Sequence, residues 1–293
     1  MSDEKPQIGR LGSFVLLASC PDRKGIVAAV TEFICRHEGN ILDLEQHVAS
    51  DDAMFFMRVE IDRSGFRLGE EEFATAFQPI AGRFAMQWEL RRTDRRPRMA
   101  IAVTREPHCL YDILVRHQSG EWAVDIPLVF SNREDLRATV ERFGIPFHVF
   151  PITPDTREAQ EARELKLLAE ERVDFLVLAR YMQILGPAFV HAYPNRILNI
   201  HHSFLPAFAG ARPYHAAFER GVKIIGATSH YVTAELDRGP IIEQDVIRVS
   251  HRDSVEEMIR KGRDNEKVVL ARAIRAHLEH RILVYQNRTV VFG

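Results

Sequence analysis

The sequence predicts an α/β protein of two domains, a small unit of order β-α-β-β-α-β followed by a larger doubly wound, mostly parallel sheet. The length of 293 residues suits about two domains at ~150 residues each. Strand-like and helix-like apolar spacings also alternate along the chain. Finally, the runs 173–179 and 197–200 are almost wholly apolar, which is typical of parallel strands that helices cover on both faces.

The first half of the small unit begins with the apolar run 14–18, which predicts a buried strand. Apolar residues between positions 26 and 34 then follow the spacing of an amphipathic helix. A second strand comes next, with Leu42, Leu44 and Val48 on one face.

The second half of the small unit begins with residues 55–61, whose alternation predicts a strand with one buried face. The residues on its opposite face are Phe56, Arg58 and Glu60. A helix with apolar residues between 73 and 80 and a last strand over 84–88 complete the six elements.

Residues 13–90 resemble an ACT domain, a ferredoxin-like βαββαβ module that binds small ligands and often pairs between subunits. The resemblance implies that residues 1–90 form a regulatory or oligomerisation domain of a homo-oligomer, either a dimer or a tetramer. It also implies a small amino-acid effector at the charged turn before the first helix, which consists of Asp22, Arg23, Lys24 and Gly25. A structural or dimerising domain without a ligand is the alternative.

A basic segment follows this unit, with five arginines in the eight residues 91–98. An anion-binding patch is one interpretation. A solvated linker is the favoured one, because Pro97 and dense charge resist packing and no aromatic side chains are interleaved to stack on bases.

Residues 99–293 are predicted to form the larger, doubly wound domain, which ends in a hairpin about Asn287. Its expected strands are 99–103, 126–130, 146–150, 173–179, 197–200 and 224–232, and its expected helices are 110–116, 133–143 and 156–171. Ligands of such sheets bind at the carboxyl ends of the strands.

Motifs and composition argue against several classes of function. No GxGxxG follows the strand 99–103 and no GxxxxGK[ST] occurs, so neither a dinucleotide nor a P-loop nucleotide cofactor is expected. A net charge of −2 argues against a nucleic-acid partner. No apolar run reaches the ~18 residues of a membrane span. The polar start of the chain and three scattered cysteines favour a cytoplasmic protein.

The segment 199–206 contains the first candidate catalytic residues. Asn199 and His201 lie two residues apart in a predicted buried strand, so they share one face while Ile200 and His202 point to the other. Burying two polar side chains at the end of a core strand costs folding free energy unless they have hydrogen-bond partners. Their presence there therefore indicates a function.

A second strand, 224–232, carries Thr228 and His230 on a common face and leads into the loop 235–240, which contains Asp237. Asn and His side chains donate hydrogen bonds to a developing oxyanion, and an Asp transfers protons, so the set suits acyl transfer through a tetrahedral intermediate.

A metal site is the competing interpretation, because His201, His202, His215, His230 and Asp237 are all ligand types. It is disfavoured, since adjacent histidines of a strand diverge and no HxxxH or HExxH motif occurs. No metal is therefore expected, and His202 and His215 are interpreted as core residues.

The segment from Leu198 to Pro206, with Phe208 and Gly210, resembles the N-x-H-x-S-x-L-P-x-F-x-G signature of folate-dependent formyltransferases, and 235–240 resembles their D-x-G loop. The resemblance implies catalytic roles for Asn199, His201 and Asp237. It implies substrate-binding roles for Arg180, Tyr181, Met182, Gln183, Ile184, Leu185, Glu235 and Gly239. Arg212 departs from the motif beside it and could change the pocket's shape.

The acceptor of the formyl group is chosen by elimination. A ribonucleotide needs a phosphate-binding loop, and the first βα turn, 106–109, offers none. A tRNA needs a basic surface. Water needs no second site, so hydrolysis of 10-formyltetrahydrofolate to tetrahydrofolate and formate is expected, in support of the one-carbon pool and purine synthesis. Formyl transfer to an amine such as glycinamide ribonucleotide, or a non-catalytic folate or amino-acid sensor, remains the alternative.

Overall fold

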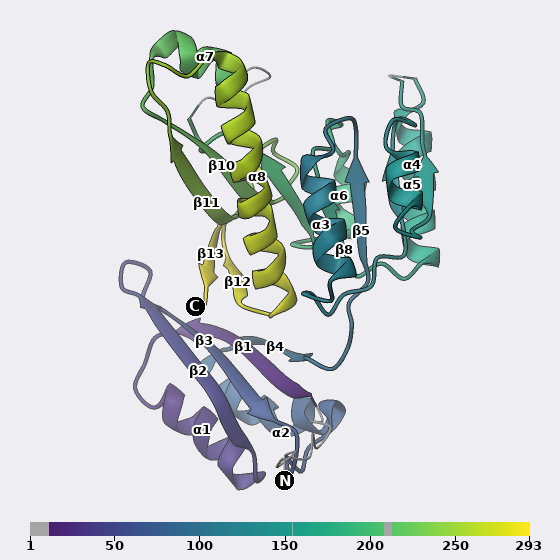
Figure 1. The fold of residues 1–293 in the computed structure, drawn as a ribbon. Coiled ribbons are helices and arrows are strands. Elements are labelled where there is room, and N and C mark those ends of the chain that lie inside the picture. Colours follow the sequence, from purple (N-terminus) through teal and green to yellow (C-terminus); the bar gives the residue numbers. More distant parts are fainter. Residues whose placement is uncertain (1–11, 154, 208–212) are drawn as a thin grey trace, which may run out of the picture. The chain divides into compact units, whose positions relative to one another are not determined.

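The chain forms two compact units in a computed structural model that describes residues 12–153, 155–207 and 213–293 (Figure 1). The first unit extends to Arg95 and includes Glu279–Leu283 and Val290–Gly293, while the second comprises Arg96–Leu278 and Val284–Thr289. Among the described residues, no helix is long and apolar enough to cross a membrane.

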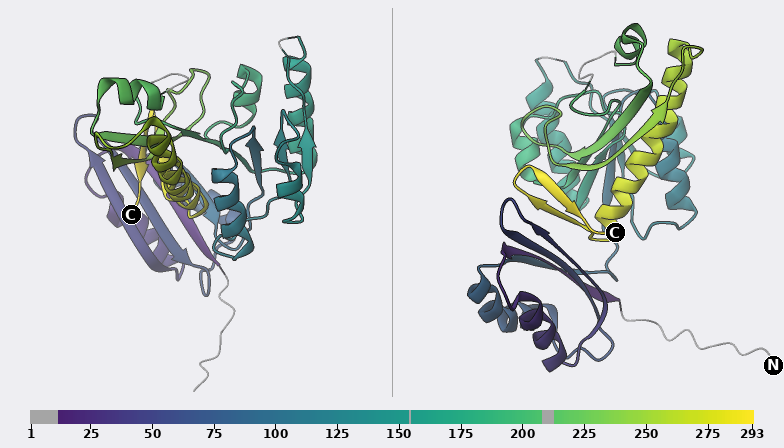
Figure 2. Two further views of the ribbon diagram at one scale, coloured as in Figure 1. Left: turned by 45° about the horizontal axis from the view of Figure 1, so that its top comes forward. Right: turned by 90° about the vertical axis from the view of Figure 1, so that its left-hand side faces the viewer.

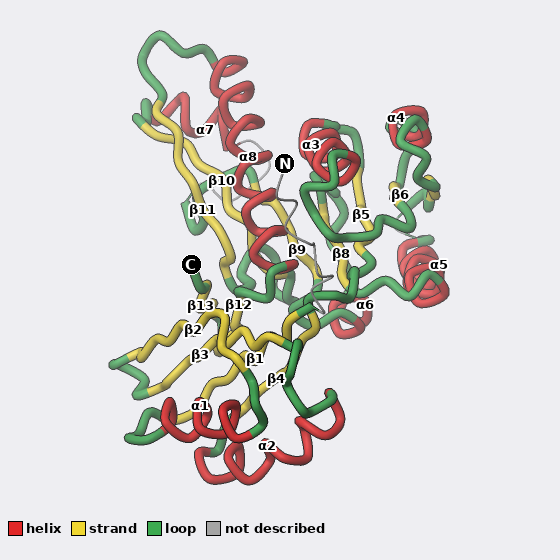
Figure 3. The backbone as a smooth tube through the Cα atoms, turned by 60° about the horizontal axis from the view of Figure 1, so that its bottom comes forward, coloured by secondary structure: helices red, strands yellow, loops and turns green. Residues whose placement is uncertain are grey.

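The first unit contains a four-stranded antiparallel sheet of order β2-β3-β1-β4. Its elements are β1 Ser13–Pro21, α1 Ile26–Arg36, β2 Asn40–Ala49, β3 Met54–Asp62, α2 Glu70–Phe84 and β4 Gln87–Arg92. Both helices lie on one face of the sheet (Figure 3). Between them lies a core rich in phenylalanine, which includes Phe33, Phe73 and Phe77. The predicted βαββαβ order is therefore confirmed.

The last strand of this unit differs from the prediction. Phe84 ends α2, and β4 begins at Gln87 and continues to Arg92. The first two arginines of the basic segment are thus strand residues, and Arg92 pairs with Phe14 of β1. The Arg92 side chain bonds Asp94, which lowers the pKa of that carboxyl. Local carboxylates therefore offset part of the positive charge.

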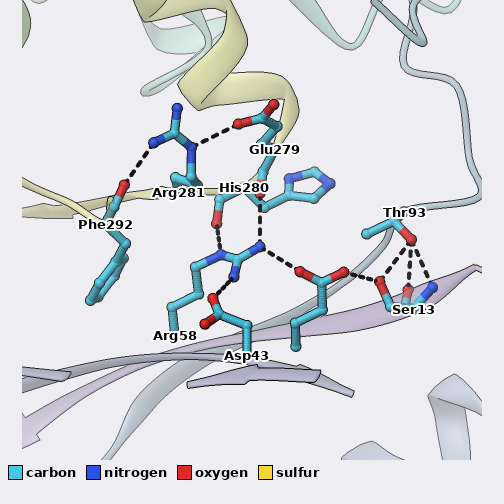
Figure 4. Close-up of polar contacts among 9 residues, drawn as sticks. Ser13, Asp43, Arg58, Thr93, Glu279, His280, Arg281 and Phe292 are labelled. Carbon is cyan, nitrogen blue, oxygen red and sulfur yellow. Dashed lines mark hydrogen bonds and ion pairs between the residues drawn. The ribbon is translucent and has the colours of Figure 1, made fainter. Parts of the chain in front are cut away.

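The expected solvent face of β3 is also covered. Phe56 and Arg58 are 1% and 5% exposed, and Arg58 contacts the C-terminal residues Glu279 and His280. The Arg58 guanidinium donates to Asp43, to Glu60 and to the backbone carbonyls of Glu279 and His280 (Figure 4). A buried guanidinium is tolerated here since it has both carboxylate and carbonyl partners.

The second unit contains a seven-stranded sheet of order β11-β10-β9-β8-β5-β6-β7. Its strands are β5 Met99–Val103, β6 Val129–Ser131, β7 Phe147–Val149, β8 Phe175–Leu178, β9 Ile197–His201, β10 Ile224–Tyr231 and β11 Ile241–Arg248. The strands from β5 to β9 are parallel, and β10 is antiparallel to both of its neighbours. This confirms the doubly wound, mostly parallel prediction.

Helices cover both faces of this sheet, with α3 and α8 on one side and α5 and α6 on the other (Figure 2). The helices are α3 His108–Gln118, α4 Arg137–Glu141, α5 Arg157–Glu170, α6 Pro187–Ala192, α7 Pro213–Arg220 and α8 Val255–Leu278. The sequence did not predict α6, α7, α8 or β11. A terminal hairpin, β12 Ile282–Tyr285 and β13 Arg288–Val291, turns at the expected Asn287.

Candidate active site

The site is built on β9 and β10, whose antiparallel register sets Asn199 opposite His230 and His201 opposite Thr228. These four side chains share one face of the sheet, because strand residues two apart point the same way. Thr228 also fixes the turn after β9, since its hydroxyl donates to the carbonyl of Ser203 and accepts from the backbone N–H of Leu205.

Asp237 reaches this face from the loop after β10. Gly239 makes the approach possible, because a Cβ at that position would lie 1.8 Å from the carbonyl oxygen of Tyr231. Asp237 itself has a left-handed backbone, with φ of 54°, a conformation that Asp tolerates better than most residues. Its Oδ1 lies 3.4 Å from Nδ1 of His201 and 3.8 Å from Nε2 of His230.

The structure thus brings Asn199, His201 and Asp237 together, as the sequence predicted. The pKa of Asp237 is lowered, chiefly by its hydrogen bond to His201 and by the charge of that ring. Nε2 of His201 is buried and has no partner among the described residues. When both ring nitrogens are protonated, Nδ1 donates to Asp237 and Nε2 remains to donate to a ligand.

His230 is a site residue that the sequence did not predict. Its Nδ1 lies 2.9 Å from the carbonyl oxygen of Tyr231 and must therefore donate. Burial lowers the pKa of His230, so the ring is neutral and its Nε2 accepts from Nδ2 of Asn199 at 3.2 Å. This contact fixes the Asn199 amide with its NH₂ toward His230. The short motif Thr-Ser-His in β10 was its signal in the sequence.

His202 does not point to the opposite face of the sheet from His201, which corrects the prediction from strand alternation. Its ring centroid is 5.0 Å from that of His201, because β9 ends at His201 and the strand alternation ends with it. Nδ1 of His202 lies 2.6 Å from Nη1 of Arg180. Burial and the Arg180 charge lower the pKa of His202 to about 4. His215, also expected in the core, is exposed on α7.

The predicted substrate-binding loop 180–185 divides into inward and outward residues. Tyr181 and Leu185 are buried in the core, and the Tyr181 hydroxyl donates to Glu164 of α5 at 3.3 Å. Met182 and Ile184 are exposed, while Gln183 is half-buried.

Arg180 is directed to His202 and away from solvent, with a side chain only 13% exposed. The side chains in this loop that are free to meet a substrate are therefore those of residues 182–184.

The remaining predicted substrate-binding residues lie in the Asp237 loop. Glu235 is exposed and forms an ion pair with Arg238 at 3.7 Å. Gly239 is buried and acts through the close approach to Tyr231. Phe208, Gly210 and Arg212 lie outside the described residues.

The predicted effector residues form an exposed turn in the first unit. The backbone N–H of Asp22 bonds the Ala53 carbonyl at 2.8 Å, and Gly25, with φ of 93°, is the N-cap residue before α1. The Arg23 guanidinium is turned to the end of α2, where it donates to the carbonyls of Arg83 and Phe84. Asp22 and Lys24 are therefore the side chains of this turn that are left for a ligand.

Three further polar residues, His108, Tyr214 and Glu266, lie behind His202. Glu266 Oε2 is 2.8 Å from His108 Nε2, and its Oε1 accepts from the Tyr214 hydroxyl at 2.8 Å. The ligand atoms of His108, Cys109 and Glu266 lie within 4.8 Å of one another. Both Glu266 oxygens already have hydrogen-bond partners, and burial raises the pKa of the Cys109 thiol, which disfavours the thiolate that would bind a metal. We therefore interpret His108, Tyr214 and Glu266 as a hydrogen-bonded cluster rather than as part of a metal site.

Family models describe both parts of the chain. An ACT domain matches residues 13–74 and a formyl transferase domain matches residues 97–274. The fold and the site thus define an ACT-domain protein of the formyl transferase class, which confirms both resemblances.

The formyltetrahydrofolate deformylase of Synechocystis sp. is 55% identical over 278 residues, 95% of this chain and 98% of the relative. The chain belongs to the formyltetrahydrofolate deformylase family. A crystal structure of such a deformylase from Pseudomonas syringae has a TM-score of 0.94 and 49% identity, covering 98% of this chain and 96% of that one. Glycinamide ribonucleotide transformylase 1 from Symbiobacterium toebii has a TM-score of 0.65 and 31% identity, covering 70% of this chain and 98% of that one.

Proposed function

We propose that this chain hydrolyses 10-formyltetrahydrofolate to tetrahydrofolate and formate at Asn199, His201 and Asp237. The observation that carries this conclusion is the convergence of these three side chains in a protein whose deformylase relatives match it over both units. Similarity to the transformylase covers the smaller share of the chain, so water is the favoured acceptor.

The reaction needs an oxyanion site and a group that handles protons. Water attacks the formyl carbon, and the carbonyl oxygen becomes negative as the C–O bond forms. The Nε2–H of protonated His201 and the second amide hydrogen of Asn199 are the donors available for that oxygen. The tetrahedral intermediate then breaks its C–N bond, and the leaving nitrogen takes a proton to give tetrahydrofolate.

Asp237 is the carboxylate next to this site. We assign it the proton that the attacking water loses and that the leaving nitrogen gains. Its lowered pKa means that it holds this proton only in passing. In the resting site Oδ1 of Asp237 faces Nδ1 of His201 at 3.4 Å.

The direct test is incubation of the purified protein with 10-formyltetrahydrofolate alone, followed by measurement of formate and tetrahydrofolate. Equal amounts of the two products, unchanged by EDTA, are expected, because the proposed chemistry needs no metal or cofactor. Formation of formylated product only when glycinamide ribonucleotide is added would assign the chain to formyl transfer. Binding of folate without turnover would assign it to the sensor class.

We also propose regulation through the first unit. Its ACT fold and the exposed Asp22 and Lys24 suit a small amino acid, whose ammonium and carboxylate they would pair with, at an interface between subunits of a homo-oligomer. The formate and tetrahydrofolate released would serve the one-carbon supply of purine synthesis. The three described cysteines are free, which suits a cytoplasmic location.

A further inference from the structure

A buried series of polar contacts extends from His201 toward α8. The His202 ring lies beside that of His201, and its Nδ1 faces Nη1 of Arg180 at 2.6 Å. Nε of Arg180 lies 3.4 Å from Oε2 of Glu266. Glu266 is 1% exposed and is held in turn by His108 of α3 and Tyr214 of α7. Four elements, β9, α3, α7 and α8, and the loop after β8 therefore supply one connected group.

These contacts fix the protonation state of His202. A guanidinium has only donors, so Nδ1 of His202 must accept, and the proton of the neutral ring resides on Nε2. Among the described residues, the charged groups that face this ring are Arg180, His201, Asp237 and Glu266, and the uncharged Tyr214 ring lies 6.1 Å from it. The two cationic neighbours, Arg180 and a protonated His201, oppose a second proton on His202.

Helix α8 is shaped to hold this group. Glycine in a helix interior costs about 1 kcal/mol relative to alanine, yet α8 has Gly262 well inside it. A Cβ at Gly262 would lie 2.1 Å from the Tyr214 hydroxyl oxygen. The glycine thus makes room for the Tyr214 hydroxyl, which bonds Glu266 one turn further along α8. The low helix propensity of glycine therefore destabilises α8 next to the Glu266 contacts.

We propose that Arg180 and Glu266 are positioning residues of the hydrolytic reaction, holding His202 as the neutral Nε2–H tautomer against His201. The mobile positive charge of the histidine pair is thereby confined to His201, next to Asp237 and the oxyanion position. The catalytic part of this inference rests on the proposed function. It also changes the role of Arg180, which the family resemblance implied to be a substrate contact.

The protonation state is tested directly by NMR of protein with ¹⁵N-labelled histidine, with the His202 signals assigned by their loss in His202→Asn. In the wild-type protein, His202 should be the neutral Nε2–H tautomer from pH 6 to 9. In Arg180→Gln its pKa should rise by at least one unit, whereas Arg180→Lys, which keeps the charge, should stay closer to wild type. A charged or Nδ1–H His202 in the wild-type protein at pH 7 would overturn the proposal without any variant.

The matched control is Arg116→Gln, which removes a guanidinium paired with Asp112 and Glu121 on the same unit. This change should leave the His202 titration unaltered. If Arg116→Gln moved the His202 pKa as far as Arg180→Gln does, the shift would reflect general loss of charge, and the specific role of Arg180 would be rejected.

Kinetics then separate positioning from substrate binding. In Arg180→Gln, kcat at pH 5 relative to pH 8 should fall about twofold or more below the wild-type ratio, because His202 now competes for the proton. KM for 10-formyltetrahydrofolate should change by less than twofold. A tenfold rise in KM with an unchanged pH profile would instead identify Arg180 as a substrate contact. If the wild-type protein made no formate, the proposed function would fail while the NMR result still decided the state of His202.

Discussion

Nδ1 of His201 lies 3.4 Å from Oδ1 of Asp237, although one residue ends a buried strand and the other lies in a loop 36 positions later. The antiparallel return of β10 and the close approach of Gly239 to Tyr231 bring the two side chains together. The Asp237 carboxylate thus faces Nδ1 of His201, while Nε2 of the same ring has no partner among the described residues. When it carries a proton, the unpartnered nitrogen is placed to donate to an oxyanion.

Asp237→Asn should lower turnover by roughly 10²–10⁴ while folate still binds, because it keeps the shape and removes the charge and the proton acceptor. The measurements are kcat with 10-formyltetrahydrofolate and the Kd of tetrahydrofolate by calorimetry. Asp155→Asn, an exposed carboxylate change on the same unit, is the control. Near-normal kcat in Asp237→Asn would remove Asp237 from the mechanism.

Asn199→Ala should reduce kcat by about 10²–10³, the usual effect of losing one oxyanion donor. It also removes the hydrogen bond that Asn199 donates to Nε2 of His230, so thermal stability should fall modestly. Asn40→Ala, an exposed change in the first unit, should alter neither quantity. A loss of stability with kcat preserved in the folded fraction would show that Asn199 only supports His230.

The sequence predicted the parts of the fold and site that depend on local patterns. The apolar strands and the spacing from Asn199 to His201 identified β9 and its polar face, because strand alternation is a local rule. Alternation failed one residue later, at His202, because it stops where the strand does. Glu266 was unpredictable for a different reason: α8 is highly charged and contains Gly262, and its partners lie on α3, on α7 and after β8.

An amino acid that binds the first unit should change the activity and raise the melting temperature, since a ligand that binds only the folded state stabilises it. Glycine and methionine are the first of the twenty to test. Asp22→Asn and Lys24→Gln should weaken the response, whereas Lys166→Gln on α5, an exposed lysine of the second unit, should not. No response to any of the twenty amino acids would leave the ACT unit a structural or oligomerising role.

Glu164 should make the protein less stable as pH rises. It is buried on α5, and desolvation together with the charge of Glu161 raises its pKa to about 8. Only Oε1 has a partner among the described residues, the hydroxyl of Tyr181. In the unfolded chain the carboxyl ionises near its ordinary pKa of about 4.3.

Protonated Glu164 therefore makes its full contribution to the free energy of unfolding below about pH 4.3. This contribution is lost as the pH rises through about 8. Between these limits the loss is on the order of 1.4 kcal/mol per pH unit. Glu164→Gln does not titrate, so its free energy of unfolding relative to wild type should increase from pH 5 to pH 8, as measured by urea denaturation. Glu158→Gln, an exposed change on the same helix, should show no such trend. If the difference in free energy of unfolding between wild type and Glu164→Gln were constant from pH 5 to pH 9, Glu164 would be ionised in the folded protein. The Tyr181 hydroxyl would then donate to a charged carboxylate.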